Sequence, residues 1–271
     1  FMKIIKPTIG GHDGSSFREL IDLWQEKGFC EVVHNKNTNQ AFSNQPSLDP
    51  SARPWAGSEG DILLYDNPIL DKLHTDLKWN MALFANKVHQ GKNCYPWTFW
   101  PKHPKMYEQA TQSGILNYDD RKINSVFIGS MTTNGRIKQA SWKSVIEKFH
   151  LTPPGTSFCD HKQYLQILKN SKFGLCLPGV GPKCLREMEL MGFGTVPIFT
   201  PGVSTNYYNE LKEGVHFLFA NNPKEIPLIL NSCTKEKWLF LSKNCIKWFN
   251  ENASPKGSFE VTRKIIEENY E

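Results

Sequence analysis

The sequence lacks the patterns that mark several large classes of protein. No apolar run approaches the roughly 18 residues that a membrane-spanning helix needs. The amino-terminal residues show no signal-peptide pattern, and no internal repeat or low-complexity tract occurs. We therefore expect neither a membrane anchor in this chain nor a secretory address.

Metal-binding and disulfide patterns are missing too. The seven cysteines are odd in number and include no CxxC pair, and the eight histidines form no HExxH motif. No DxD motif occurs, since Asp119 and Asp120 are adjacent, as in a solvated turn. We expect no metal, no disulfide scaffold, and a reducing compartment, the cytoplasm.

The net charge of the chain is also small. Thirty-two Lys and Arg residues stand against 27 Asp and Glu residues, which gives a formal net charge of +5. Nucleic-acid-binding proteins usually concentrate basic residues in one stripe or patch, and here the densest cluster is Lys102 and Lys105. No nucleic-acid partner is expected, whereas a few excess cations suit an anionic small molecule such as a nucleotide diphosphate.

Short apolar stretches alternate with segments of helical spacing along the 271 residues. Such alternation is typical of an α/β protein with parallel sheets. Strands are expected at residues 3–6, 61–65, 81–85, 125–128, 173–177, 195–199 and 216–219. A helix is expected to contain Phe17 and the apolar residues up to Trp24. Further helices are expected at 136–149, 162–170 and 183–191, and between 223 and the end of the chain.

A proline-rich crossing divides this pattern. Three prolines lie between Tyr95 and Pro104, which indicates a stiff extended segment and a domain boundary near it. Trp97, Phe99 and Trp100 in this crossing could stack on sugar rings or a uracil, or pack at the junction of the domains. We predict an N-terminal domain at 1–104, a C-terminal domain at 105–250, and a C-terminal helix at 251–271 that could pack back on the N-terminal domain.

The most informative segment is the predicted strand–loop–helix at residues 173–191. Gly179 and Gly181 remove side chains that would block close approach, and helix N-termini favour anions. Lys183 and Arg186 add positive charge, and Glu189 lies on the same helix face as Arg186, where a carboxylate can accept hydrogen bonds from ribose hydroxyls. Alternatively, the glycines only serve the turn, and Arg186 and Glu189 form an ion pair.

The stretch SKFGLCLPGVGPKCLREMELMGFGTVPIF resembles the C-terminal half of exostosin-like glycosyltransferases. The family pattern is an S-x-F strand, a P-x-G loop, R-x-x-E, a glycine and a P-I or P-V strand. Cys184 departs from it, because the family often has serine there. Upstream, Phe127–Ser130 and Arg136 resemble the family's F-x-G turn and following basic residue. The matching residues of the stretch are Ser171, Phe173, Pro178, Gly179, Arg186, Glu189, Gly194, Pro197 and Ile198.

The resemblance implies a GT-B architecture, in which two Rossmann-like domains with parallel sheets face each other across a cleft. It implies an inverting glycosyltransferase that moves a sugar from a UDP-sugar to a hydroxyl of a glycan acceptor without a metal or another cofactor. The short chain looks like a compact stand-alone version of the kind that large algal viruses carry. Xylose is the expected sugar, and the host cytoplasm is the expected location if the protein is viral.

An inverting transfer needs a base for the acceptor hydroxyl and positive groups for the departing diphosphate. Asp13 is the favoured base, with His12 and Asp66 as alternatives, because the resemblance places the first strand–helix loop at the cleft. Asp13 could instead cap the following helix, and Asp66 could form a turn before Pro68. The expected donor-binding residues are Gly129, Ser130, Arg136, Pro178, Gly179, Gly181, Lys183, Arg186 and Glu189.

Two other functions stay open at this point. One is a non-catalytic nucleotide- or carbohydrate-binding α/β protein that keeps the glycine-rich loop and lacks a base. The other is a GT-B enzyme of a different family, which would use another nucleotide sugar.

Overall fold

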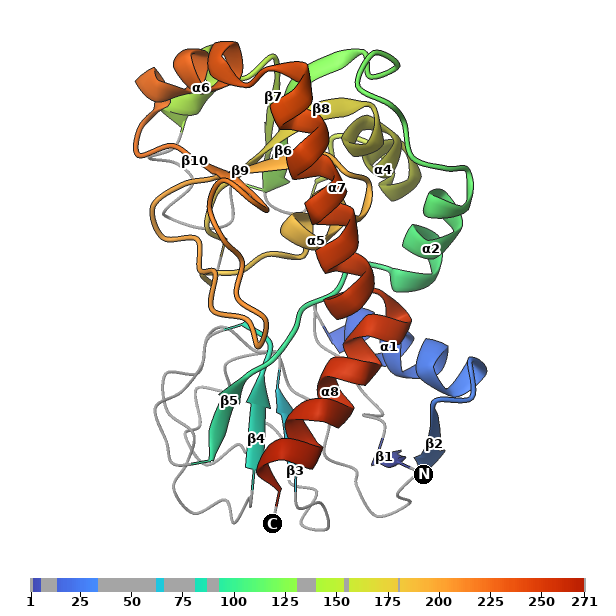
Figure 1. Cartoon of the computed structure of the whole chain (residues 1–271). Helices are drawn as coiled ribbons and strands as arrows, with labels where there is room; N and C mark the ends of the chain where they lie inside the picture. Colours follow the sequence, from blue (N-terminus) through green and yellow to red (C-terminus); the bar gives the residue numbers. More distant parts are fainter. Residues whose placement is uncertain are drawn as a thin grey trace. The chain divides into compact units, whose positions relative to one another are not determined.

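The computed structural model describes residues 2–5, 14–33, 62–65, 81–86, 93–130, 140–153, 156–179 and 181–270 (Figure 1). The chain divides into two compact units. Unit 1 comprises Phe1–Lys105, Tyr207–Asn209 and Glu251–Glu271, and unit 2 comprises Met106–Asn206 and Glu210–Asn250. The first division follows Lys105, one residue after the end of the proline-rich crossing.

Unit 1 contains two parallel sheets among its described strands. β1 (Met2–Ile5) pairs with β2 (Cys30–Val33), and α1 (Gly14–Glu26) connects these two strands. A second sheet has the order β3-β4-β5, formed by β3 (Ile62–Tyr65), β4 (Met81–Phe84) and β5 (Cys94–Pro96). Strands β2 and β5 are absent from the sequence-based prediction, because each is a run of only three or four residues without a clear alternation.

The aromatic residues of the proline-rich crossing form the core of unit 1. Trp97, Phe99 and Trp100 are buried, and Phe17 of α1 stacks on Trp100 at 5.0 Å between ring centroids. The Trp97 indole N–H donates to the Thr262 hydroxyl at 2.7 Å. Their rings are covered by protein, so stacking on a sugar or a uracil is excluded for these three side chains in this structure.

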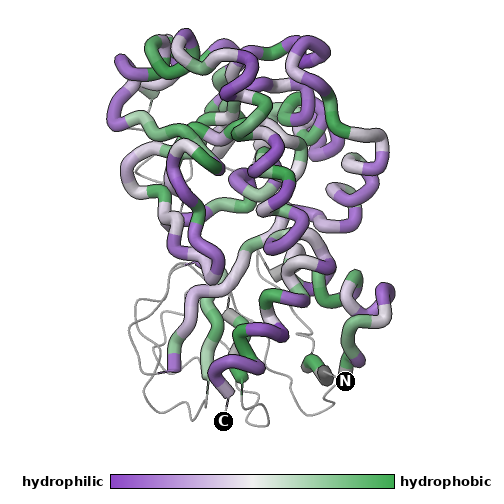
Figure 2. Tube along the Cα trace, viewed as in Figure 1, coloured by the Kyte–Doolittle hydropathy of each residue, from purple (hydrophilic) through white to green (hydrophobic). Residues whose placement is uncertain are grey.

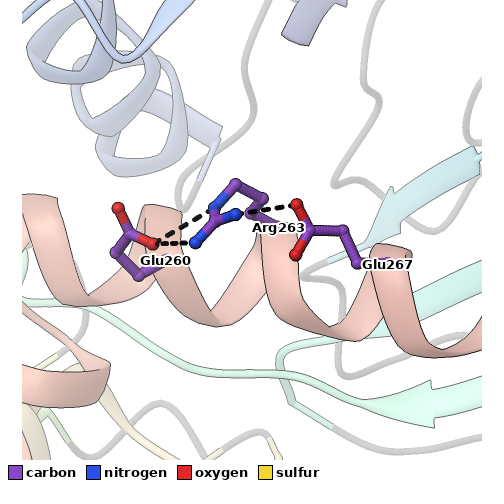
Figure 3. A network of polar contacts seen from close by, with 3 residues as sticks. All are labelled: Glu260, Arg263 and Glu267. Atoms are coloured by element: carbon purple, nitrogen blue, oxygen red, sulfur yellow. Dashed lines mark hydrogen bonds and ion pairs between the residues drawn. The ribbon is translucent and has the colours of Figure 1, made fainter. Parts of the chain in front are cut away.

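The C-terminal helix α8 (Pro255–Asn269) packs against α1 within unit 1. The Trp24 indole N–H of α1 donates to the Ser258 hydroxyl at 3.1 Å. On the exposed side of α8, Arg263 donates to Glu260 and Glu267 at 2.8 and 2.7 Å (Figure 3). Hydrophilic and hydrophobic residues alternate along α8 (Figure 2), as expected for a helix with one buried face.

Unit 2 is built on one parallel sheet of five strands in the order β10-β9-β8-β6-β7. The strands are β6 (Ile123–Ser130), β7 (Lys148–Thr152), β8 (Ser171–Cys176), β9 (Val196–Phe199) and β10 (Leu218–Phe219). The chain passes from β6 to β7 on one side and then to β8 on the other side of β6. In open α/β sheets, such a reversal of strand order is where ligands bind, beyond the carboxyl ends of the strands.

Helices connect these strands and follow them. They are α2 (Pro104–Gln112), α4 (His161–Lys169), α5 (Leu185–Gly192), α6 (Ile226–Ser232) and α7 (Lys235–Asn252), with short 3-10 helices at Ala140–Ser144 and Pro223–Glu225. None of the helices in the described ranges is long and apolar enough to cross a membrane.

A buried arginine ties the starts of the central strands of unit 2 together. Arg121 donates from Nη1 to the carbonyls of Lys169 and Ser171 at 3.0 and 2.7 Å, and from Nη2 to the carbonyl of Phe193 at 2.6 Å. Burial lowers the pKa of Arg121 to about 10. The charge is held by carbonyl oxygens, so this arginine has a structural role.

The predicted helix at 136–149 is wrong over its described part. Residues Ala140–Ser144 form a 3-10 helix, and Phe149 lies in strand β7, where it pairs with Phe127 of β6. Trp142, Val145, Ile146 and Phe149 have the i, i+3, i+4, i+7 spacing of a helix. However, they pack into the hydrophobic core from a 3-10 helix, the turn after it and strand β7. Pairing with β6 outweighed the local pattern.

The fold class is confirmed, because the described strands form parallel sheets and the helices alternate with them. The predicted helices at 162–170 and 183–191 correspond to α4 and α5, and the chain ends in helices as expected.

Candidate functional site

The glycine-rich loop follows the central strand β8 at the carboxyl edge of the unit 2 sheet. Pro178, Gly179 and Gly181 lie between β8 and α5, and the Gly179 N–H donates to the Gly181 carbonyl at 3.1 Å. Val126 of β6 pairs with Gly174 of β8, so the end of β6 at Gly129–Ser130 lies level with the start of this loop. The structure therefore brings two of the predicted donor-binding segments together at the reversal of strand order.

Arg186 on the first turn of α5 joins these two segments. It is 8% exposed, its Nη2 donates to the Ile128 carbonyl of β6 at 2.8 Å, and its guanidinium lies 4.5 Å from the centroid of the Phe127 ring. Burial acts to lower the pKa of Arg186, and the nearby Tyr164 and cysteines outweigh it, so the pKa is raised. Arg186 is held as a cation.

Two donors of this cation are unsatisfied. Nε and Nη1 of Arg186 are buried and have no hydrogen-bond partner within the described ranges. A buried donor without an acceptor costs about 1–3 kcal/mol, and more when it is charged. An anionic ligand with several acceptor oxygens would satisfy both N–H groups, which is the chemistry of a phosphate.

Glu189 lies one turn after Arg186 and is 2% exposed. Its carboxylate oxygen Oε2 accepts from the Tyr164 hydroxyl of α4 at 2.7 Å, and its backbone carbonyl accepts from the Tyr107 hydroxyl of α2 at 2.7 Å. The Tyr164 hydroxyl also interacts with Arg186, so this tyrosine lies between the two charged residues of α5. Sequence reasoning missed both tyrosines, because nothing in the chain before 173 signals that they face α5.

The N-terminus of α5 already contains an anion of the protein. The Glu187 carboxylate is buried and accepts from the Cys184 N–H at the start of the helix. One of the backbone donors that the sequence analysis assigned to a ligand is therefore used within the chain. Arg186 adds the full positive charge of its guanidinium at this end of α5.

Lys183 precedes α5 instead of lying in it. Its side chain is 2% exposed, and Nζ donates to the carbonyl of Asn206. Burial lowers the pKa of Lys183 to about 7, and the charge of Glu187 opposes this shift. In this structure Lys183 ties the loop before α5 to the segment around residue 206, and its contact with a donor stays a prediction.

The remaining predicted site residues lie outside the described residues. These are the candidate bases and one cation, namely His12, Asp13, Asp66 and Arg136. Asp119 and Asp120 lie on an exposed turn, where Asp119 pairs with Lys235. Within the described ranges no group of three or more His, Cys, Asp or Glu residues could hold a metal ion.

A surface hollow of about 580 Å³ lies elsewhere on unit 2, over α4. Its lining is mostly apolar and carries one cation, Lys162. The lining residues are Phe158, Cys159, Lys162, Gln163, Gln166 and Ile167. None of the predicted donor-binding residues is among them. The edge between β6 and β8 is the better candidate site, because the buried Nε and Nη1 of Arg186 have no acceptor there within the described ranges.

No family model matches the chain. Mouse ribitol-5-phosphate xylosyltransferase 1 is 28% identical over an alignment of 171 residues, and the match covers 53% of this chain and 37% of that protein. The match therefore spans little more than a third of the relative's length. The crystal structure of an α1,3-fucosyltransferase aligns over 98% of this chain and 89% of its own, with 13% identity and a TM-score of 0.46.

Proposed function

We propose that the protein is an inverting glycosyltransferase of GT-B architecture that transfers a sugar from a UDP-sugar to a hydroxyl of a glycan acceptor. The observation that carries the proposal is Arg186, a buried cation at the reversal of strand order in unit 2, whose Nε and Nη1 have no acceptor among the residues that the structure describes. Such a group suits the diphosphate of a nucleotide sugar. The resemblance of residues 171–199 to exostosin-like glycosyltransferases supports the same reaction class.

Xylose is the proposed sugar. The partial match to a protein named ribitol-5-phosphate xylosyltransferase supports both a glycosyl transfer and this pentose. The same name suggests a phosphorylated sugar alcohol as one acceptor to test beside neutral glycans. A pocket for xylose has to exclude one hydroxymethyl group of glucose, and discrimination of that size is worth about 1–3 kcal/mol.

The proposed reaction needs no metal and no further cofactor. A base removes the proton of the acceptor hydroxyl, whose oxygen forms a bond to the anomeric carbon of the donor. The bond from that carbon to the diphosphate oxygen breaks on the opposite face, and the diphosphate leaves with the electron pair. Arg186 stabilises the charge that develops on this leaving group. Asp13 is the proposed base, with His12 and Asp66 as alternatives.

A nucleotide screen tests the donor class directly. Calorimetry with UDP, GDP, ADP and CMP should give binding of UDP, and Arg186→Gln should weaken it by about 10- to 100-fold, as expected for loss of charge-assisted hydrogen bonds. Arg263→Gln is the matched control, because it removes an exposed arginine of α8 (Figure 3). Equal binding by the wild type and Arg186→Gln would contradict the proposed site.

Turnover assays decide between the three functions. With UDP-xylose and an acceptor panel, Asp13→Asn should abolish transfer while UDP still binds. Normal transfer by this variant would reassign the base to His12 or Asp66. Binding of UDP by the wild type without transfer or hydrolysis of any UDP-sugar would indicate a non-catalytic binding protein, and preference for another nucleotide would indicate a different GT-B family.

A further inference from the structure

Arg186 lies over the ring of Phe127, a residue of β6 that the proposed reaction does not use. The Cζ atom of the guanidinium is 4.5 Å from the centroid of this ring. Phe127 is fully buried and Arg186 is nearly so, which shields the pair from water. Cation–π attraction is weak at exposed sites and stronger when the cation is desolvated. The ring is therefore one of the groups that hold the charge of Arg186 in the interior of unit 2.

Phe127 is itself held in one place. It pairs with Phe149 across the boundary of β6 and β7, and the two rings stack with their centroids 5.0 Å apart. Strand β6 has a hydrogen-bonded neighbour on each side, β7 and β8. Side chains in such close-packed interiors occupy defined rotamers. The ring thus offers Arg186 a fixed surface.

The use of an arginine depends on the direction of its planar fork of five N–H groups. The carbonyl of Ile128, the residue after Phe127, accepts from Nη2 of Arg186 at 2.8 Å and fixes one corner of the fork. One hydrogen bond still lets the plane tilt, and the ring of Phe127 restricts that tilt because it attracts the cation to its face. The two contacts together set the direction of Nε and Nη1, which have no acceptor among the described residues.

We propose that Phe127 is a positioning residue that orients Arg186 toward the diphosphate of the donor. The proposal rests on the proposed function, since it assumes that Arg186 binds this diphosphate. Phe127 has no polar group in its side chain and needs no contact with the ligand, so it acts through Arg186. Its loss should weaken recognition of the phosphate groups and leave recognition of the rest of the nucleotide unchanged.

The test compares two ligands that differ only in the diphosphate. Calorimetry gives the ratio of the dissociation constants of uridine and UDP, with weakly bound uridine measured by its displacement of UDP. In the wild type this ratio should be about 100 or more, as expected for charge-assisted hydrogen bonds. Phe127→Leu should lower it by about fivefold or more, the size of a desolvated cation–π contact, and should bind uridine nearly as the wild type does.

Phe173→Leu is the matched control, because Phe173 is a buried ring of the same hydrophobic core at the start of β8. It should lower the melting temperature about as much as Phe127→Leu and leave the ratio unchanged. If Phe127→Leu does not fold, Phe127→Met replaces it, since methionine fills irregular core space. An unchanged ratio in the Phe127 variant, or an equal fall in the control, would overturn the positioning role in favour of a purely structural one.

A double variant shows whether Phe127 acts through Arg186. In Arg186→Gln the cation is gone, so adding Phe127→Leu should change the ratio no further. A further fall as large as that in the wild-type background would mean that Phe127 affects the ligand by another route, and the proposal would be wrong.

Failure of the two proposals can be told apart. If the wild type binds no UDP, or if Arg186→Gln keeps the wild-type ratio, the proposed donor site fails and the positioning role falls with it. If the ratio depends on Arg186 and not on Phe127, the donor site stands and only the role of Phe127 is overturned.

Discussion

Two cations only three residues apart in the sequence have different roles in the fold. Lys183 is buried against the Asn206 carbonyl before α5, whereas Arg186 reaches the end of β6 and keeps two donors without an acceptor in the described part of the chain. From the sequence, both residues were expected to bind the diphosphate, Arg186 also because it matches the family pattern. The pKa of Lys183 is lowered to about 7, so this residue is only partly charged near neutral pH.

Lys183 should make the stability of the protein depend on pH. Its pKa is about 7 in the folded chain, well below the ordinary value of 10.5 for a lysine, so between these two values the unfolded chain binds one proton more than the folded chain. Stability should then rise with pH across this window, by up to about 1.4 kcal/mol per pH unit. Lys183→Met keeps the apolar stem and removes the titration, so urea unfolding should show a flatter dependence between pH 7 and 9.5.

The control for this measurement is Lys243→Met, which changes an exposed lysine of α7. Its unfolding free energy should follow the wild type across the same pH range. A wild-type slope in Lys183→Met would mean that the ammonium of Lys183 stays charged in the folded state.

At the scale of elements, α5 approaches the sheet closely enough to need a glycine. A Cβ on Gly174 of β8 would lie 2.4 Å from Cδ2 of Leu190 on α5, which is too short for any carbon–carbon contact. Both residues lie in the interior of unit 2. This close approach sets the height of α5 above β8, and hence the reach of Arg186 to β6.

Gly174→Ala should therefore destabilise the protein by about 1–3 kcal/mol, as overpacked cores do. Leu190→Ala removes the clashing atoms and creates a cavity, at a cost of about 2–5 kcal/mol alone. In the double variant the two changes should compensate, so that its loss in urea unfolding is smaller than the sum of the single losses. If the losses in unfolding free energy of the two single variants add fully in the double variant, positions 174 and 190 are not in contact.

At the scale of the whole molecule, the chain's last segment belongs to unit 1. Helix α8 supplies hydroxyl acceptors to Trp24 and Trp97, and Phe259 packs against Trp24 with ring centroids 5.5 Å apart. Unit 1 thus has a core built from both ends of the sequence. The core of unit 2 lies entirely within residues 106–250 of the chain.

Truncation after Ala253 should therefore affect the two units unequally. Without α8, the indole N–H groups of Trp24 and Trp97 lose their acceptors, and the apolar faces that α8 covers meet water. Hydrogen exchange should show loss of protection in α1 and in residues 97–100, while β6 and β8 of unit 2 keep theirs. Equal loss in both units would show that they unfold as one cooperative body, and a chain ending at Asn269 serves as the control.

Local pattern predicted a large part of the fold. Apolar runs identified strands β6, β8 and β9, because consecutive residues in each of them are buried. Helical spacing of apolar residues identified helices α1, α4 and α5, because each buries one face. The same spacing gave a helix where β7 lies, since periodicity reports which residues are buried and not which partner buries them. The short strands β2 and β5 had no local signal.

For the candidate site, the sequence by itself determined the glycine-rich loop, the cation Arg186 and the carboxylate Glu189, because these residue types and their spacing are properties of the chain. Only the tertiary structure decided the strand order that brings the ends of β6 and β8 together, the burial of Lys183, and the hydrogen bonds of Tyr107 and Tyr164 to Glu189. These contacts join residues from 23 to 82 positions apart. They depend on how helices pack on the sheet, and no local pattern encodes that packing.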